Sequence, residues 1–328
     1  MWEDRRLSVG WILVGPRHVP SARIEGYNLH DWLNANGHES TIIHAPPFFS
    51  QELSIIPQLF KKYDIIVFQK VFAGIADQAM RWYKHNNIVT IFYITDLVMG
   101  IDGAVYFSDK TIMSSSFMAN CVMEKHKKRV VLLKDAYESP KDFYKTDYKS
   151  DKLKVLWFGT ARVLKWVEMF RKTIEDEGCE FITICEGDRA TKRWNEKEIH
   201  NDIKNADVVF IPSPLDGFEK CKDENKLVQA MVIGLPVIAY QVPAYMELYN
   251  RFNPHPFCIA ATPEDVVMNI RLLKDWELRK EIGQWARECV KDDYHIDSIG
   301  KKFLDILWNT KKEVDDAKRR TDQFTLNI

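Results

Sequence analysis

Short apolar runs alternate with amphipathic segments along most of the chain. The first run, at residues 7–14, precedes Gly15-Pro16, and an apolar run before such a turn predicts a buried strand followed by a loop. Apolar residues then recur at helical spacing over residues 22–36, with Ser21 as a candidate N-cap and Gly37 as a stop signal. The chain therefore begins with a predicted strand and helix.

The same alternation continues to residue 133. It predicts strands at 41–44, 64–69, 88–94 and 130–133, helices at 51–62, 75–85 and 115–125, and an apolar segment at 104–107. Strands and helices that alternate with short connections indicate a mostly parallel sheet with helices on both faces. Ligands of such sheets bind beyond the carboxyl ends of the strands.

Residues 134–152 are polar and contain Pro140, so we predict an interdomain linker there. The alternation then restarts. It predicts strands at 153–158, 180–185, 207–211, 236–240 and 257–260, and helices at 163–176, 195–205, 225–233, 244–249, 263–274, 276–291 and from 296 to at least 315. The expected fold class is α/β, with two Rossmann-like domains.

Length and composition agree with this organisation. The 328 residues suffice for two domains, and 46% hydrophobic with 28% charged residues is an ordinary globular composition. The net charge of -1 provides no field that would recruit nucleic acid, so we expect no nucleic-acid partner. The basic run at 125–129 (KHKKR) leaves open a weak peripheral membrane contact, with a solvated helix end as the alternative.

The six cysteines form no C-x-x-C pair and have no neighbouring histidine cluster. This spacing predicts neither a zinc site nor a disulfide framework, and buried reduced thiols favour a cytoplasmic protein. The first apolar run is too short for a transmembrane helix and does not resemble a signal peptide. We expect no bound metal and no cofactor.

The segment from 206 to 248 carries most of the candidate chemistry. A buried strand leads into a polar, mixed-charge turn and then directly into a helix, which places Lys222, Asn225 and Lys226 near a helix N-terminus. Free amides and the helix dipole favour an anion there, and two lysines complete a candidate diphosphate site. The alternative is a solvated helix start with ordinary surface lysines.

Lys222-Asp223-Glu224-Asn225-Lys226 is followed by Gln229-Ala230-Met231 and then by GLPVIA at 234–239. In this order the motifs resemble the donor-binding segment of retaining glycosyltransferases with the GT-B fold, the group 1 or family 4-like enzymes. The resemblance implies two Rossmann-like domains that face each other across a cleft. It implies an acceptor domain at 1–140, a nucleotide-sugar donor domain at 141–300, and a helix and tail at 301–328 that pack back on the first domain.

The resemblance also implies roles for single residues. Lys222 and Asn225 would contact the donor phosphates or sugar, and position 229 would face the ribose. The family's acidic pair corresponds to Cys221 and Gln229, so the chain departs from the pattern there. Gln229 can bond a ribose hydroxyl but supplies no charge. Whether Lys222, Glu219 or Glu224 compensates stays open.

A second candidate segment is the turn that opens the second half, from Gly159 to Lys165. The family has Gly-Arg there and a lysine five residues after the arginine. Lys165 occupies the lysine position, Thr160 occupies the arginine position, and Arg162 is a candidate substitute. A nucleoside diphosphate leaves as an anion, which cations and amides must stabilise if no metal does. The alternative is that Arg162 and Lys165 are exposed residues of an amphipathic helix.

The first half offers three further candidates. Gly15 and Arg23 lie in a segment that is similar to the N-terminal loop of the same enzymes, where Arg23 would reach a phosphate or an acceptor. The alternative is a turn with a surface arginine. Asp96 ends a buried strand and would orient an acceptor hydroxyl or act as general base, or else cap the next helix.

These observations predict a hexosyltransferase-like enzyme that moves a sugar from a nucleotide-sugar co-substrate to an unidentified acceptor, which is a saccharide, a lipid-linked saccharide or another molecule. Such an activity suits polysaccharide biosynthesis. By resemblance the transfer is retaining and metal-independent, with Lys165, Lys222 and Arg162 stabilising the departing diphosphate. Two alternatives stay open: a sugar-nucleotide epimerase, and a non-catalytic sugar-nucleotide-binding protein, which the missing acidic pair favours.

Overall fold

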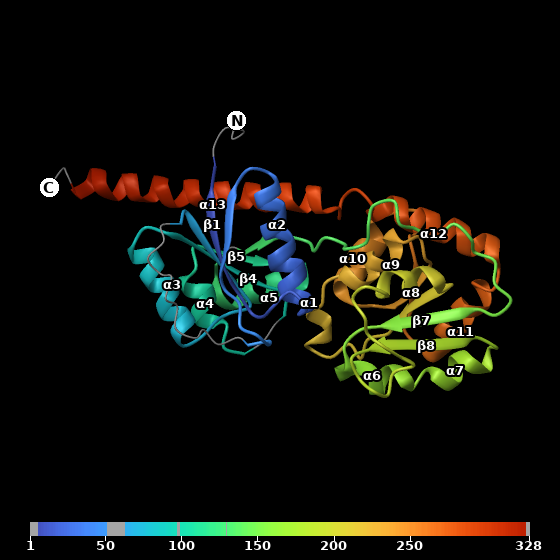
Figure 1. The fold of residues 1–328 in the computed structure, drawn as a ribbon. Coiled ribbons are helices and arrows are strands. Elements are labelled where there is room, and N and C mark those ends of the chain that lie inside the picture. The colour runs from blue at the N-terminus through green and yellow to red at the C-terminus, as the bar shows by residue number, and fades with distance from the viewer. Residues whose placement is uncertain (1–5, 51–62, 97–98, 129, 326–328) are drawn as a thin grey trace. The chain divides into compact units, whose positions relative to one another are not determined.

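The computed structural model describes residues 6–50, 63–96, 99–128 and 130–325. The chain forms two compact units, one of residues 1–136 with 296–328 and the other of residues 137–295. Each unit contains a six-stranded parallel sheet with helices on both faces (Figure 1).

The first unit is built on a sheet of strand order β2-β1-β3-β4-β5-β6. Its strands are β1 (Ser8–Leu13), β2 (Glu39–His44), β3 (Ile65–Gln69), β4 (Val89–Ile94), β5 (Lys110–Met113) and β6 (Val130–Leu132). The sequence pattern did not predict β5, because its sequence KTIM begins with two polar residues and forms no apolar run. The apolar segment at 104–107 lies instead in helix α4 (Asp102–Phe107).

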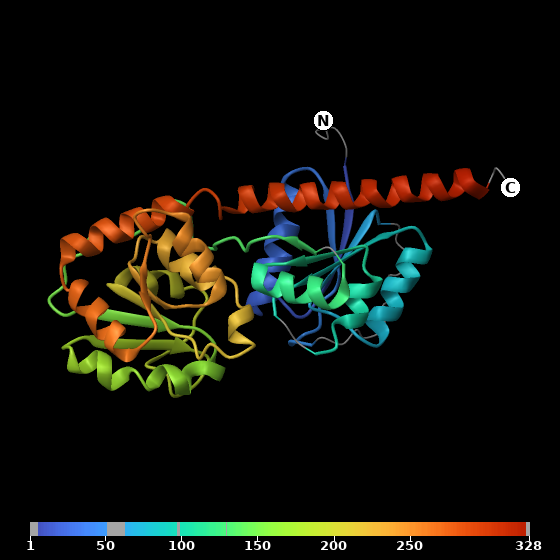
Figure 2. The ribbon, with the colours of Figure 1, turned by 180° about the vertical axis from the view of Figure 1, so that it is seen from behind.

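The two faces of this sheet are covered by different helices. Helices α2 (Asn28–Ala35) and α13 (Ile296–Thr325) cover one face, where the rings of Trp11 and Phe303 stack at 5.5 Å. Figure 2 shows α13 from behind as a long red helix that runs along the first unit. Helix α3 (Ile75–His85) covers the other face, where Tyr83 packs edge-on against Phe68 at 6.1 Å, and α4 and α5 (Ser116–His126) follow it.

The second unit has the strand order β12-β11-β10-β7-β8-β9, again all parallel. Its strands are β7 (Lys154–Phe158), β8 (Glu180–Cys185), β9 (Lys192–Arg193), β10 (Val208–Ile211), β11 (Val237–Tyr240) and β12 (Cys258–Ala260). One face is covered by α6 (Ala161–Glu168), α7 (Arg171–Asp176) and α11 (Pro263–Leu272). The other face is covered by α8 (Ile199–Asn205), α9 (Asn225–Val232), α10 (Pro243–Arg251) and α12 (Trp276–Val290).

Two expectations about the second unit were wrong. The helix expected at 163–176 is interrupted between α6 and α7, where Phe170 turns into the core and its ring lies 5.3 Å from that of Phe210. The segment expected to be a linker packs against the second unit from residue 137 onward. Within it the Lys145 ammonium donates to Ala206 O at 2.8 Å and the Tyr148 hydroxyl donates to Gly234 O at 2.8 Å. The segment has a polar sequence and is nevertheless packed against the unit, because its long side chains bury their apolar stems and bond through their polar ends.

Some predictions lie outside the described residues, namely the helix at 51–62 and Arg129 of the basic run. Within the described ranges, no helix combines the length and apolar character that crossing a membrane requires.

Candidate functional site

The second unit has a topological switch point between β7 and β10. Strand β8 lies on one side of β7 and β10 on the other, so successive crossovers run in opposite directions from there. Ligands of open parallel sheets bind in the crevice that this reversal leaves outside the carboxyl ends of the strands. The turn after β7 and the loop after β10 meet at this edge, and they hold the predicted donor residues.

Lys226 connects the two predicted donor segments. It lies at the start of α9, yet its Nζ would be only 3.1 Å from a Cβ atom placed on Gly159, in the turn after β7. Burial lowers the pKa of Lys226 to about 8. The positive charges of Lys222 and Arg162 act in the same direction, whereas the carboxylates of Glu219 and Asp223 act against it. An anion bound beside Lys226 would favour its charged form.

Arg162 and Lys222 meet at one aromatic ring. Arg162, in the first turn of α6, forms an ion pair with Glu219 and places its guanidinium 4.4 Å from the ring centroid of Phe218. The Nζ of Lys222 lies 4.4 Å from the same centroid. The Arg162 side chain is 52% exposed whereas that of Glu219 is 11% exposed. The guanidinium therefore remains accessible to solvent, while the carboxylate that pairs with it is largely buried. The sequence analysis missed Phe218, an aromatic residue within a mixed-charge loop.

The remaining predicted donor residues lie on the same elements. Thr160 is the exposed N-cap of α6, and Lys165 is exposed one turn beyond Arg162. Asn225 begins α9, and its backbone N–H donates to Asp223 Oδ1 at 3.0 Å, so this amide is engaged within the loop. The roles of these three residues stay predictions.

The two positions where the family carries its acidic pair are both buried. The thiol of Cys221 donates to Gly217 O at 3.2 Å, and Gln229 Oε1 accepts the backbone N–H of Glu138 at 3.2 Å. Of the candidate replacements, Glu224 accepts the Tyr294 hydroxyl at 2.7 Å. Glu219 pairs with Arg162.

In the first unit the switch point lies between β1 and β3, with β2 on the far side of β1. Gly15 follows β1, and a Cβ atom there would lie 2.8 Å from Val19 Cγ2, so a larger residue would displace the Val19 side chain. Helix α1 (Pro20–Ala22) begins at Pro20 with Val19 as its N-cap, which corrects the assignment of Ser21. Arg23 is buried, and its Nη1 donates to Arg17 O at 3.4 Å, so it is no ordinary surface arginine.

A buried charged cluster lies at the same edge of this sheet. Lys70 follows β3 in a left-handed conformation (φ 55°), and its Nζ lies 2.7 Å from Asp96 Oδ2 and 3.6 Å from Glu25 Oε1. Glu25, in the π-helical turn η1 (Arg23–Tyr27), accepts the amide of Gln69 and the hydroxyl of Thr95, each at 2.7 Å. Buried charged residues in strained backbone are typical of functional sites.

The pKa shifts in this cluster have clear causes. Burial raises the pKa of Glu25, and the attraction of Lys70 offsets this in part. Burial also opposes the charge on Lys70, but Glu25 and Asp96 outweigh it and raise the pKa of Lys70. The sequence analysis missed both residues. The sequence did offer one signal for this cluster, a lysine directly after the largely apolar strand IIVFQ.

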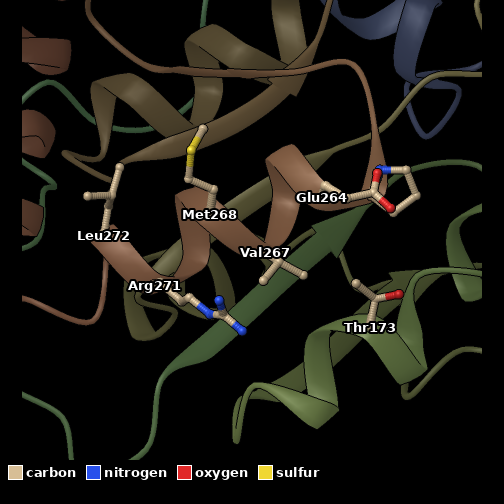
Figure 3. A pocket seen from close by; sticks show the side chains of 7 residues that line it. Thr173, Glu264, Val267, Met268, Arg271 and Leu272 are labelled. Atoms are coloured by element: carbon tan, nitrogen blue, oxygen red, sulfur yellow. The ribbon is translucent and has the colours of Figure 1, made fainter.

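A surface hollow of about 620 Å³ lies elsewhere on the second unit, beside α7 and α11 (Figure 3). Side chains of α11 such as Val267 and Met268 line it, with Thr173 of α7 opposite. No predicted site residue lines this hollow.

Two curated proteins are similar to parts of the sequence, whereas no protein-family model matches it. An uncharacterised glycosyltransferase of Methanocaldococcus jannaschii is 27% identical over 127 residues, which are 38% of this chain and 29% of that protein. The N-acetyl-alpha-D-glucosaminyl L-malate synthase of Bacillus anthracis is 23% identical over 174 residues, which are 48% of this chain and 44% of the enzyme. The matches thus span less than half of either relative.

Solved structures match nearly the whole chain at low sequence identity. Sucrose-phosphate synthase from Thermosynechococcus elongatus has a TM-score of 0.66 at 14% identity, over 93% of this chain and 99% of that one. The catalytic domain of starch synthase IV from Arabidopsis thaliana, bound to ADP and acarbose, has a TM-score of 0.65 at 11% identity, over 94% and 100%. HepE of Anabaena, in complex with UDP and glucose, has a TM-score of 0.65 at 12% identity, over 92% and 99%.

Proposed function

We propose that this chain, which has the GT-B fold of these glycosyltransferases, transfers a sugar from a nucleoside-diphosphate sugar to an acceptor hydroxyl. One observation carries the proposal. Arg162, Lys222 and Lys226 converge at the switch point of the second unit, beside the first turns of α6 and α9. Three cations and two helix N-termini at one edge suit the diphosphate of a donor.

The arrangement suggests how the residues would act. When the bond between the sugar C1 and the diphosphate oxygen breaks, negative charge accumulates on the diphosphate. Arg162, Lys222 and Lys226 would stabilise that charge, which grows toward the transition state. The acceptor oxygen forms the new bond to C1, and its proton passes to the departing diphosphate. We assign the acceptor to the first unit, where Asp96 presents a carboxylate that is 22% exposed and would orient the hydroxyl.

We further propose that the transferred sugar is a hexose, that its anomeric configuration is retained and that no divalent metal is needed. Three protein cations would provide the positive charge that a metal supplies in other transferases. The nucleotide sugar would then be a co-substrate, and the reaction would require no small molecule besides it and the acceptor. Product anomers determined by NMR test retention. Unchanged turnover in the presence of EDTA tests metal independence, and a loss of turnover on chelation would contradict it.

The first test of the function is binding and turnover of donors. Calorimetry with UDP, ADP and GDP should detect one preferred nucleotide, and a panel of matching nucleotide sugars should reveal a donor that is slowly hydrolysed without acceptor. Lys222→Ala should weaken nucleotide binding at least tenfold, in line with the loss of a charge-assisted contact. Lys172→Ala is the matched control, because Lys172 is an exposed lysine on α7 paired with Asp176 at 2.7 Å. Unaltered binding in Lys222→Ala would refute the site assignment.

A non-catalytic sugar-nucleotide-binding protein is the second candidate. Cys221 and Gln229 favour it, because neither supplies the carboxylate of the resembling enzymes and Gln229 Oε1 is already bonded to Glu138. The same assays separate the two candidates. Nucleotide binding without turnover of any donor, with and without added saccharides, would support the binding protein and refute the enzyme.

A further inference from the structure

Phe218 occupies a central position in the candidate donor site. The guanidinium carbon of Arg162 and the ammonium nitrogen of Lys222 each lie 4.4 Å from the centroid of its ring. The two cationic centres are therefore within about 9 Å of each other, both at cation–π distance from one half-buried ring.

Two like charges so close together repel each other, and flexible side chains would normally separate. The electron-rich face of an aromatic ring attracts each cation, so the ring offsets part of this repulsion. Glu219, directly after Phe218, pairs with Arg162 and fixes it further. A guanidinium carries five N–H donors, so an arginine held by one carboxylate oxygen and one ring retains donors for a phosphate.

We propose that Phe218 is a positioning residue that holds Arg162 and Lys222 as a preformed pair of cations for the diphosphate of the donor. The proposal rests on the nucleotide-sugar function assigned above. It explains why an apolar ring stands in a loop of otherwise polar character, DGFEKCKDEN, with both cations around it. Preformed cations bind an anion more tightly because less side-chain freedom is lost on binding.

The proposal predicts which part of the nucleotide depends on the ring. Affinity for the diphosphate should fall when the ring is removed, whereas the contribution of the base and ribose should not change. A merely structural role of Phe218 would instead affect nucleoside diphosphate and monophosphate alike. The ratio of the two affinities therefore separates positioning of the cations from general damage to the loop.

The experiment compares Phe218→Leu with Phe218→Tyr by calorimetry, using whichever of UDP, ADP or GDP the wild-type protein binds and the matching monophosphate. Phe218→Leu should weaken diphosphate binding about tenfold and change monophosphate binding less than threefold. Phe218→Tyr, which keeps an aromatic face, should stay within about threefold of wild type for both ligands.

Equal affinity of wild type and Phe218→Leu for the diphosphate would overturn the proposal. So would an equal loss for both ligands in Phe218→Leu, or a loss in Phe218→Tyr as large as that in Phe218→Leu. If the wild-type protein binds none of the three diphosphates, the function proposed above fails, and that outcome overturns this inference with it. Thermal unfolding of each variant confirms that the measured losses come from folded protein.

Discussion

The ammonium of Lys70 lies 2.7 Å from the carboxylate of Asp96, at the carboxyl ends of the adjacent strands β3 and β4. Glu25 Oε1 lies 3.6 Å from the same ammonium nitrogen, and both Lys70 and Glu25 are buried. Lys70 therefore interacts with both carboxylates at this edge of the sheet, and the buried Asp135 also favours its charged form. Removing Lys70 would leave buried negative charge without its cation.

Lys70→Met should therefore destabilise the first unit by about 3 kcal/mol, because an uncompensated charge in a buried pair costs several kcal/mol. Denaturant unfolding measures the change. Lys125→Met is the control, since Lys125 pairs with Asp102 at the surface and its loss should cost less than about 1 kcal/mol. Equal stability of the two variants would show that the Lys70 cluster contributes nothing beyond a surface ion pair.

Nucleotide binding should depend on pH through Lys226. The pKa of Lys226 is about 8 in the free protein, and a bound diphosphate favours the charged form and raises that pKa. Below pH 7 Lys226 is already protonated, so its ionisation should not change the nucleotide affinity. Above pH 8 binding must take up a proton, so affinity should fall about tenfold between pH 7 and pH 9.

Calorimetry in buffers of different ionisation enthalpy measures this proton uptake directly at pH 8. Lys226→Arg is the informative variant, because arginine stays charged over the whole range. Its binding should lose the dependence between pH 7 and pH 9. A wild-type protein that binds without proton uptake at pH 8 would contradict the assignment of Lys226 to the diphosphate.

Gly159→Ala should disturb the site through a steric effect. The added Cβ would lie 2.8 Å from Trp157 Cζ2 and 3.1 Å from Lys226 Nζ, both closer than ordinary contacts. Because the buried Trp157 cannot yield readily, the turn that holds Gly159 must shift relative to Lys226. We therefore expect nucleotide affinity to fall about tenfold. Gly217→Ala is the control in the neighbouring loop, since a Cβ there meets no atom within 4 Å. Equal affinities of the two variants would exclude the steric coupling.

Lys165→Ala tests the residue that the family resemblance places at the leaving diphosphate. If Lys165 contacts the transition state, donor turnover should fall about 100-fold with little change in nucleotide binding, as expected for a group that acts on developing charge. Rates of donor hydrolysis with and without acceptor measure the effect. Turnover close to wild type would leave Arg162, Lys222 and Lys226 as sufficient cations and Lys165 as an exposed helix residue.

The alternation of apolar and amphipathic segments was enough to predict two α/β units. Strands such as β10 and β11 are continuous apolar runs. A parallel sheet that is covered on both faces requires such runs, so the sequence pattern indicates them. The pattern failed where a strand begins with polar residues, as in β5, or where a core position interrupted a helix, as at Phe170. It also failed at residues 137–152, because their polar side chains bury their stems and bond to distant backbone.

The candidate site, like the fold, was predicted from the sequence only in part. Lys222, Asn225 and Lys226 could be placed near a helix start from sequence, because helix termini have local signals. The approach of Lys226 to Gly159, the two cations on Phe218, and the Lys70 cluster with Glu25 and Asp96 were decided by tertiary structure alone. Apart from Phe218 and Lys222, which are four residues apart, these groups are separated by tens of residues in sequence. They meet because parallel strands bring their carboxyl ends to one edge. Sequence determined which charges the chain carries, and the order of the strands determined which of them meet.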